Sequence, residues 1–482
     1  MLGSRGIDSA AEKAMSEQES ESNWQGGSLI AVLYVALLVQ AFAGISLRGL
    51  YADGAVFVTQ MLANENFVVG PSRWMSNVIV ETPEVIAIEL GIGTSDRIAS
   101  IFSITSSLLP GLLFLACGYI LPPAKRRFIV FPAFVYFGGT LASQFASVTE
   151  GLVATAYVWM LFFLLLFWRL SVWRSSVICV LSIGCIRLHE EMSFLAPLLM
   201  AAGCLRFRDT KPLFARLALG LALLALLTSA MVGFYWILFP YAPEERGLFV
   251  SQSLERQWWL YIPGSGCNLP ALLSLMAIVA IITCVAAPRI SRTAVLAFGG
   301  SSIVLSVASF WVDDLTAPAA QFYSRHNSAF LSFAVMILVM IARDVPDISF
   351  RMSMPPVRSI IMVLGIATSL WHVQATKKWS AFLANFRNVL ASNRGIIPAT
   401  VLLQPSNARS AQLTHMMMWS WTNPDLSILA LPRRCVTSII ANPTAGWQPY
   451  NLSDPTTLPR ISGLTYTYLL ARDSQPAVCS SP

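Results

Sequence analysis

The sequence predicts an all-α, polytopic membrane protein, on the basis of its composition, its long apolar segments and the positions of its basic residues. Of the 482 residues, 55% are hydrophobic and only 12% are charged, and the mean hydropathy is +0.63. Soluble globular proteins carry about 25% charged residues. The net charge of +7 is therefore interpreted as membrane topology rather than as affinity for nucleic acid.

About eleven apolar segments have a length that suits or approaches that of a membrane-spanning helix, which needs about 20 residues. They lie near residues 28–46, 98–121, 128–146, 152–168, 174–188, 192–205, 217–239, 269–287, 294–311, 328–342 and 359–373. The chain is then divided into a cytoplasmic disordered tail (1–27), a transmembrane domain (28–373) and a small extracytoplasmic C-terminal region (374–482). The acidic tail lacks the basic start and early apolar core of a signal peptide.

The basic residues predict the orientation of the chain. With the N-terminus in the cytoplasm, fourteen Lys and Arg residues fall in cytoplasmic loops and seven in outer loops as far as residue 327. This asymmetry follows the positive-inside rule. The same outer loops hold fourteen acidic residues, against three in the cytoplasmic loops after the tail. Acidic residues contribute little to topology, so a site on the outer face would explain them; the alternative is that long loops hold more polar residues.

The first outer loop, about residues 47–97, is the longest before the C-terminal region. Its apolar residues recur at helical spacings, for instance at Trp74, Val78 and Val85, with charged residues between them. This pattern predicts one or two amphipathic helices on the outer membrane surface. Such helices could form the wall of a groove or serve only as surface anchors.

The stretch "CIRLHEEMSFLAP" is the most informative of the outer loops. It contains four ionisable residues, namely Arg187, His189, Glu190 and Glu191. The apolar segment before them, 176–186, would span only about 16 Å as a helix, which is short of a hydrocarbon core of about 30 Å. The tip is therefore expected to lie below the outer surface, where ionisable groups are costly and commonly functional. The alternative is a buried Arg–Glu pair that only fixes the hairpin.

Three further residues at the outer ends of predicted spans are candidates for substrate binding. Glu150 begins the fourth span, where a carboxylate is also a common partner of the helix dipole. Arg325 and His326 precede the tenth span. The planar guanidinium of Arg325 suits a phosphate at headgroup level, although a basic side chain that reaches for the interface would occupy the same place.

Cofactor and metal motifs are missing from the sequence. It contains no CxxC pair, Gly-rich phosphate loop, HExxH or GxSxG motif, so neither structural zinc nor ATP-driven chemistry is expected. A divalent metal is possible but nothing indicates one. Of the eight cysteines, Cys435 and Cys479 could form a disulfide if the C-terminal region is extracytoplasmic.

The segment "SLRGLYADGAVF" places Asp53 just after the first apolar segment, where the chain should leave the membrane. An acid at this point, a long first outer loop and about eleven spans resemble the GT-C superfamily of integral-membrane glycosyltransferases, which use polyprenyl-phosphate sugars as donors. At the level of motif the resemblance lies in "LYADGAVF", with "RLHEEMSFLAP" similar to the His-Glu hairpin of some bacterial membrane families. Many members carry a paired acid, whereas Gly54 follows Asp53 here, which does not favour a metal-dependent variant.

The resemblance implies that Asp53 is the general base for the acceptor hydroxyl. A cation would stabilise the departing lipid phosphate, with Arg325 as first choice and Arg187 as second. Glu150, His189, Glu190 and His326 would then contact the substrate. The implied partners are a lipid-linked sugar donor, a glycan or lipid acceptor and membrane lipids, at the periplasmic face of a bacterial inner membrane.

Two other classes of function remain open on the sequence. A transporter or flippase of lipid-linked sugars would also need ionisable groups within the membrane, as at Arg187, His189 and Glu190. A non-catalytic membrane scaffold subunit would act through residues 374–482. A polymerase or ligase of surface glycan is a near relative of the transferase.

Overall fold

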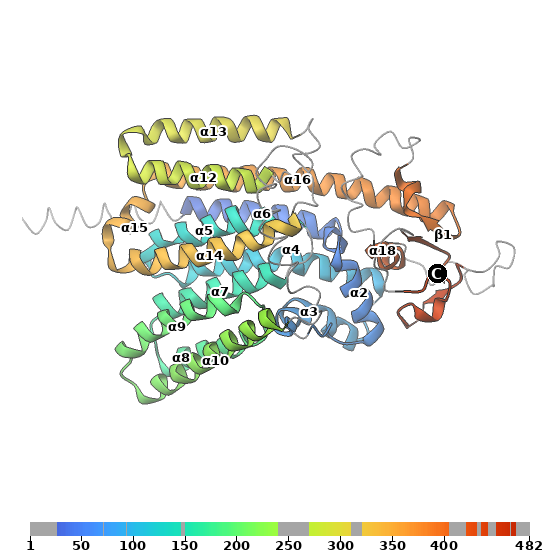
Figure 1. The fold of residues 1–482 in the computed structure, drawn as a ribbon, viewed down its shortest axis with the longest axis horizontal. Helices are drawn as coiled ribbons and strands as arrows, with labels where there is room; N and C mark the ends of the chain where they lie inside the picture. Colours follow the sequence, from blue (N-terminus) through green and yellow to red (C-terminus); the bar gives the residue numbers. More distant parts are fainter. Residues whose placement is uncertain are drawn as a thin grey trace, which may run out of the picture.

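The computed structural model describes residues 27–70, 72–92, 94–145, 150–239, 269–309, 321–403, 421–430, 435–441, 450–462 and 464–468, with only the helical backbone of 321–327. Most of these residues are helical. The long helices run side by side along one axis, and a small C-terminal unit packs at one end (Figure 1). We call this end the α2 end and the opposite one the α15 end, after helices α2 (Asp53–Asn64) and α15 (Pro346–Met352).

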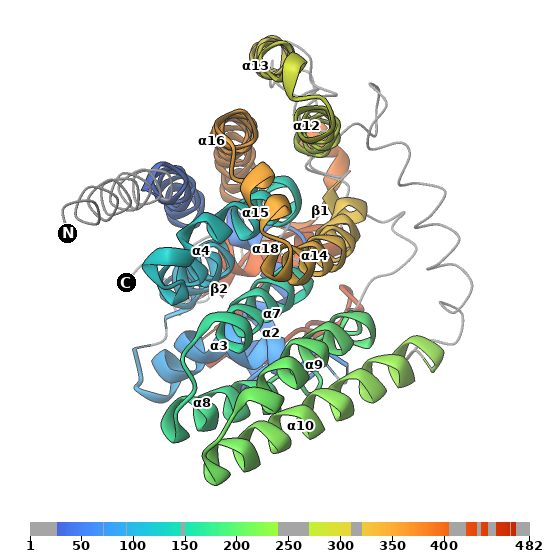
Figure 2. The same ribbon diagram turned by 90° about the vertical axis from the view of Figure 1, so that its left-hand side faces the viewer.

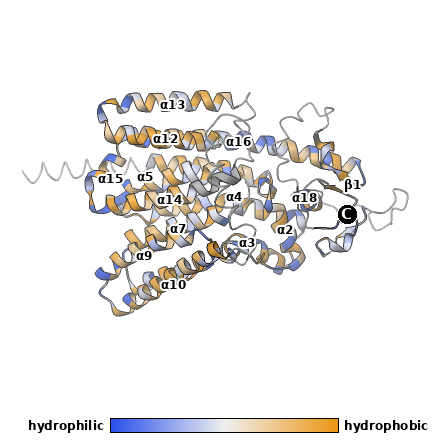
Figure 3. Cartoon of the chain, viewed as in Figure 1, coloured by the Kyte–Doolittle hydropathy of each residue, from blue (hydrophilic) through white to orange (hydrophobic). Residues whose placement is uncertain are grey.

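Seven helices in the described part of the chain are long and apolar enough to cross a membrane. They are Gly27–Ile45, α4 (Ser95–Ile120), α7 (Glu150–Phe167), α10 (Leu213–Leu238), α12 (Leu269–Ala286), the helical run Pro288–Ala308 that contains η5 (Pro288–Ile290) and α13 (Ser291–Ala308), and α16 (Pro355–Ser392). Each overlaps a predicted span, although α16 is much longer than its predicted segment, 359–373. The hydropathy of the chain agrees with a membrane-embedded bundle, because the apolar residues follow the long helices and polar ones gather at the two ends (Figure 3).

The other four predicted spans are also helical, but one is short, one is interrupted, and two are long enough but carry more polar and charged residues. Segment 174–188 corresponds to α8 (Val172–Ile183), segment 192–205 to α9 (Met192–Asp209) and segment 328–342 to α14 (Gln321–Asp344). Segment 128–146 is built from η2 (Pro123–Ile129), α5 (Val130–Val135), the π-helix η3 (Tyr136–Thr140) and α6 (Leu141–Ser143). The count of eleven spans therefore stays a prediction.

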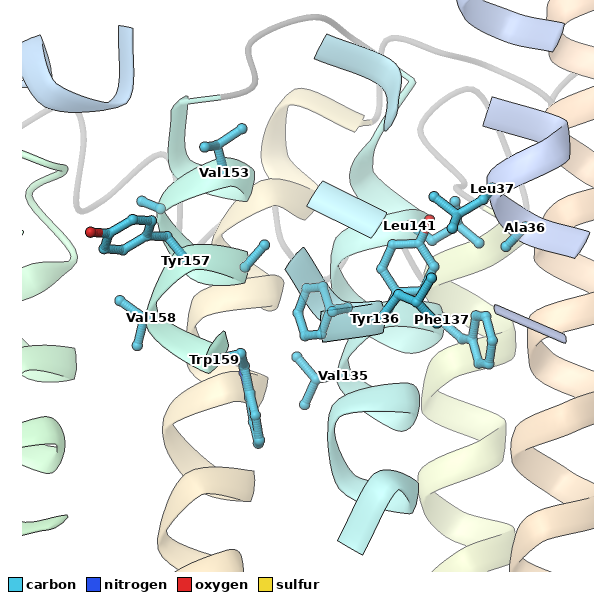
Figure 4. Packing of buried hydrophobic residues seen from close by; sticks show 14 of the residues in the cluster. Ala36, Leu37, Val135, Tyr136, Phe137, Leu141, Val153, Tyr157, Val158 and Trp159 are labelled. Carbon is cyan, nitrogen blue, oxygen red and sulfur yellow. The ribbon is translucent and has the colours of Figure 1, made fainter. Parts of the chain in front are cut away.

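The irregular helix 123–143 lies at the centre of the bundle. Its π-helical turn brings Gly139 so close to α14 that an added Cβ would lie 3.0 Å from the Cα of Ser328. Tyr136 and Phe137 project from this turn, and Trp159 of α7 points toward the same core (Figure 4). The indole of Trp159 donates a hydrogen bond to the hydroxyl of Ser332 at 3.0 Å. Buried aromatic packing thus fixes the broken helix in place, as local propensity alone would not.

Seen along the bundle, two groups of helices flank this centre (Figure 2). Helices α12, α13 and α16 lie on one side, and α8, α9 and α10 lie on the other, with α7 and α14 between them. Helices are present as predicted in residues 47–97, namely α2 and α3 (Trp74–Glu89), and both pack against α4 at the α2 end. Their place on an outer membrane surface stays a prediction.

Helix α16 continues past the predicted boundary at 373/374 to Ser392, and the strands of the C-terminal region follow it. The boundary itself stays a prediction. Strand β1 (Gly395–Pro398) pairs in parallel with β3 (Ser438–Ala441), and β2 (Cys435–Val436) pairs in parallel with β4 (Thr465–Tyr466). Among the described residues of this region, three short helices accompany the strands: η8 (Ala399–Leu403), α18 (Asn423–Ala430) and η10 (Pro455–Thr457). The unit is thus of mixed α/β structure, which the all-α prediction did not include.

Candidate functional site

Charged residues from three segments of the chain meet at the α2 end. Arg73 precedes α3, Glu150 begins α7, and the other members, His189, Glu190 and Glu191, occupy the turn between α8 and α9. We call these five residues the Arg73 cluster. The Nε of Arg73 donates to both carboxylate oxygens of Glu190 at 3.1 Å, and its Nη1 lies 4.0 Å from Glu150. The Nε2 of His189 lies 3.4 Å from Glu190, and its Nδ1 lies 3.7 Å from Glu191.

The turn that carries these residues is fixed to α3. Arg187 adopts a left-handed backbone conformation with φ 58°, and its carbonyl oxygen accepts a hydrogen bond from the backbone N–H of Met75 at 3.1 Å. An Arg–Glu pair is therefore present at this hairpin, but the arginine that pairs with Glu190 is Arg73, which precedes α3. Arg73 carried no sequence signal beyond its charge, because its partner lies more than a hundred residues away.

The electrostatics of the Arg73 cluster follow from burial and pairing. Burial by itself would raise the pKa of Glu190, but His189 and Arg73 outweigh it and hold this pKa well below its usual value. Burial likewise opposes the charge of Arg73, and Glu190 and Glu150 more than offset it, so the pKa of Arg73 is raised. The cluster holds three carboxyl groups against one arginine and one histidine. The described residues contain no group of ligands arranged for a metal ion.

Two more carboxyl groups are buried on α3 close to this cluster. Burial is the main cause that raises the pKa of Glu81 to about 8 and that of Glu84 to about 7. Glu81 accepts a hydrogen bond from the backbone N–H of Val68 at 2.7 Å. Both oxygens of Glu84 are buried without a hydrogen bond of good geometry among the described residues, and the Thr105 side chain close by lowers the pKa only in part. Both groups therefore hold their protons to a higher pH than an exposed glutamate does.

Asp53 occupies the first position of α2, and its side chain is partly buried. The preceding residues hold it firmly: Ala52 has a positive φ of 58°, and the ring of Tyr51 packs against Phe145 and Trp379 with centroid distances of 5.2 and 5.6 Å. Asp53 thus lies at a different helix junction from the Arg73 cluster, since α2 packs on α4 and α18 whereas α3 packs on α4 and α7.

A second polar site surrounds Arg48, which is fully buried just after the first helix. Its Nη1 donates to His372 Nδ1 at 2.9 Å and to the Thr376 hydroxyl at 3.0 Å. Its Nη2 donates to Gln40 Oε1 at 2.7 Å and to the carbonyl oxygen of Gln144 at 3.2 Å. We call these five residues the Arg48 centre. Its members come from four separate segments, so sequence analysis gave no sign of it beyond one arginine.

The Arg48 centre holds a positive charge among neutral partners. A guanidinium only donates, so His372 Nδ1 must accept, and the ring then donates from Nε2 to the carbonyl oxygen of Leu141 at 2.7 Å. His372 is therefore neutral. The guanidinium also lies 5.2 Å from the ring centre of Phe145. Gly49 allows this turn to lie on α4, because an added Cβ would be 2.4 Å from the Cα of Ser103.

Asp425 links α2 to the C-terminal unit. One oxygen of this buried carboxyl accepts hydrogen bonds from the Thr59 hydroxyl at 2.6 Å and the Tyr450 hydroxyl at 2.9 Å. The other oxygen is buried without a hydrogen-bond partner among the described residues. Burial raises the pKa of Asp425 to about 6, against the lowering effect of these bonds. The helix that carries Asp53 is thereby tied to the C-terminal unit.

An apolar cavity of about 310 Å³ lies between α13 and α16. Ile303, Val363 and Leu370 are among its lining residues. Gln374 also lines it, two residues from both His372 and Thr376 and therefore on a different face of α16 from the Arg48 centre. The amide of Gln374 is held by two hydrogen bonds with Ser309. The volume of this cavity is at the lower end of the range for small-molecule sites, about 300–1,000 Å³.

Three expected features fall outside the described residues in whole or in part. Arg325 and His326 lie on α14, where the side chains are not described. Cys435 forms a disulfide, and the five cysteines of the described residues that are free are not its partner. The remaining two cysteines, Cys267 and Cys479, lie outside the described residues, so the predicted Cys435–Cys479 bridge stays a prediction.

No protein-family model, curated protein or solved structure significantly matches this chain.

Proposed function

We propose that this chain is a membrane glycosyltransferase that moves a sugar from a polyprenyl-phosphate donor to an envelope glycan or lipid acceptor. The observation that carries the proposal is the arrangement around α16 at the α2 end. A fully buried arginine with neutral partners, Arg48, lies five residues before Asp53. An apolar cavity is lined by the same part of α16 that supplies His372.

The uncompensated positive charge of Arg48 supports the proposal that the substrate is an anion. Removing a charge from water without a countercharge is costly, and such groups in membrane proteins are commonly functional. The field of this fixed cation favours the ionised form of a nearby carboxylate and the developing charge of a departing phosphate. The positive charge of Arg48 would attract the sugar phosphate of a donor that enters at the α2 end. The isoprenoid chain of the donor would occupy apolar space such as the cavity between α13 and α16.

The proposed reaction follows from these groups. Asp53 accepts the proton of the acceptor hydroxyl as the oxygen attacks the anomeric carbon of the sugar. The bond from that carbon to the phosphate oxygen breaks, and the electron pair leaves with the polyprenyl phosphate. Arg325 or Arg187 would contact the phosphate directly. Glu150, His189 and Glu190 would position sugar hydroxyls, with Arg73 holding Glu190 in place.

The orientation belongs to this proposal. The α2 end is assigned to the periplasmic face of a bacterial inner membrane, in agreement with the positive-inside rule. A disulfide at Cys435, in the unit at that end, supports the assignment because disulfides persist in oxidising compartments.

The test compares envelope glycans by mass spectrometry among strains that express equal amounts of protein. The strains lack the gene or carry the native, Asp53→Asn or Glu65→Gln form; Glu65 is an exposed acid at the other end of α2. We expect the deletion and Asp53→Asn strains to lack the same sugar increment, and Glu65→Gln to match the native strain. Native glycans in the Asp53→Asn strain would contradict the role of Asp53 as base.

A transporter of lipid-linked sugars is the second candidate, and the protonatable carboxyl groups of α3 favour it. Glu81 and Glu84 have pKa values near neutral and lie beside the Arg73 cluster, as groups of a proton relay would. In that case Glu84→Gln would abolish the glycan increment, whereas Asp53→Asn would retain it. A transferase requires the opposite result.

A further inference from the structure

Two arginines come together at the α15 end, on the far side of the bundle from the sites described above. Arg206 lies in the last turn of α9, and Arg343 lies in the last turn of α14. The two helices are in contact. The Nη2 of Arg206 donates to the carbonyl oxygen of Trp168 at 2.7 Å, just beyond the end of α7. The ends of three helices therefore meet at this pair.

The hydrogen-bonding capacity of the pair is not filled. Arg206 Nε and Arg343 Nη1 are both buried and have no hydrogen-bond partner within the described residues. A buried donor without an acceptor loses the hydrogen bonds it makes in water and gains nothing in exchange. Both donors therefore require an acceptor that this part of the chain does not supply.

The charge of the pair is also not balanced. Burial, and then the neighbouring charge of Arg343, lower the pKa of Arg206, and Asp209 offsets only part of this. The Nε of Arg343 is 3.9 Å from the carboxylate of Asp344, which is 70% exposed. Exposed ion pairs of this kind contribute little. The dipoles of helix C-termini favour nearby cations, but they leave these two N–H groups without acceptors.

The surroundings match the headgroup layer of a membrane. The guanidinium of Arg174 lies 5.2 Å from the ring centre of Trp168 and donates to the carbonyl oxygen of Arg169. Tryptophan and arginine are the side chains that commonly line this layer. A phosphate is the anionic group in this layer whose oxygens fit two guanidinium forks.

We propose that the junction of α7, α9 and α14 binds the phosphate group of an anionic membrane lipid, with Arg206 and Arg343 as its two ligands. The inference is independent of the proposed function, because it uses the opposite end of the bundle. The phosphate oxygens accept hydrogen bonds from Arg206 Nε and Arg343 Nη1, and the negative charge relieves the repulsion between the two guanidinium groups.

The test uses the full-length protein purified in a neutral detergent. Its melting temperature is measured after addition of phosphatidylglycerol, phosphatidylcholine or inorganic phosphate, and lipid retention is measured by native mass spectrometry. We expect the native protein to prefer phosphatidylglycerol to phosphatidylcholine by at least tenfold, and to show no rise in melting temperature with inorganic phosphate. No preference for the anionic lipid would overturn the proposal, and an equal rise with inorganic phosphate would overturn the assignment to a lipid.

The variants locate the site. Arg343→Gln is the more specific test, since Arg206 also donates a hydrogen bond to Trp168. The Arg343→Gln change should reduce the preference for phosphatidylglycerol over phosphatidylcholine about tenfold. Arg343→Lys keeps the positive charge without the planar guanidinium and should retain part of the preference for phosphatidylglycerol. Arg208→Gln, on the same turn of α9 and exposed, is the matched control and should behave as the native protein. Equal loss in the control, or full preference in Arg343→Gln protein that is monodisperse, would contradict this location.

Discussion

The Arg73 cluster and the Arg48 centre both hold an arginine away from bulk water, but they stabilise it in different ways. Arg73 is partly exposed and is paired with Glu190, with Glu150 beside it. Arg48 is fully buried and has only neutral partners, namely two side chains of α16, one of the first helix and a backbone carbonyl. The first arrangement neutralises the charge, whereas the second retains it. A retained charge acts on its surroundings, which is why we propose that the field of Arg48 favours an anionic substrate nearby, while Arg325 or Arg187 contacts the phosphate itself.

The largest effect is expected at the Arg48 centre. Arg48→Met removes the donor for four buried acceptors, so the folded state should lose about 3–5 kcal/mol, the cost typical of breaking a buried charged network. The readout is the melting temperature in detergent. Arg97→Gln, at an exposed arginine of α4, is the control and should change little. If Arg48→Met melted like the native protein, Arg48 would not organise this site.

The pH dependence of stability tests the buried carboxyl groups of α3. Because the folded protein raises the pKa of Glu84 to about 7, it holds this proton more tightly than the unfolded chain. The stabilisation is complete below about pH 4.5 and is lost as the pH rises through 7, by about 3 kcal/mol in all. Glu84→Gln should flatten the fall in melting temperature over this range. Glu89→Gln, an exposed acid of the same helix, should leave the fall unchanged.

Breaking the ion pair of the Arg73 cluster should have a smaller effect. Glu190→Gln keeps the shape but loses the charge, and because the pair is partly exposed we expect a loss of about 1–3 kcal/mol. Glu65→Gln serves as the exposed control. Arg73→Gln should add little to the effect of Glu190→Gln in the double variant, since both remove one interaction. If the two losses of stability were additive, the interaction of Arg73 with Glu150 rather than with Glu190 would be its main stabilising contact.

The smallest effect is expected where α2 meets the C-terminal unit. Tyr450→Phe removes one hydrogen bond to Asp425 and should cost about 1 kcal/mol. The pKa of Asp425 is about 6, so the loss should be measured on either side of this value, in melting temperatures at pH 5 and pH 8. Above pH 6 the carboxylate is charged, and a hydrogen bond to a charged group is stronger. A larger loss at pH 5 than at pH 8 would contradict this assignment.

Sequence analysis found the Arg73 cluster in part because the turn supplies three of its residues in a row. The segment "RLHEE" stands out between two short apolar segments, and a short helix, α8, does precede it. The Arg48 centre gave no such sign, since its members span residues 40 to 376. A polar residue in an apolar segment shows that a partner is needed. It does not show which of several distant residues that partner will be.

The sequence by itself determined the helical, membrane-embedded character of the chain and the approximate positions of its long helices, although not the C-terminal limit of α16. Hydrophobic length and turn residues act locally, so they can be recognised along the chain. Only the tertiary structure decided that Arg73 rather than Arg187 pairs with Glu190, that Arg48 faces His372, and that strands far apart in sequence pair in the C-terminal unit. These contacts depend on how helices pack in three dimensions, because an isolated buried polar group is too costly to leave unpaired and accepts whichever partner the packing brings near.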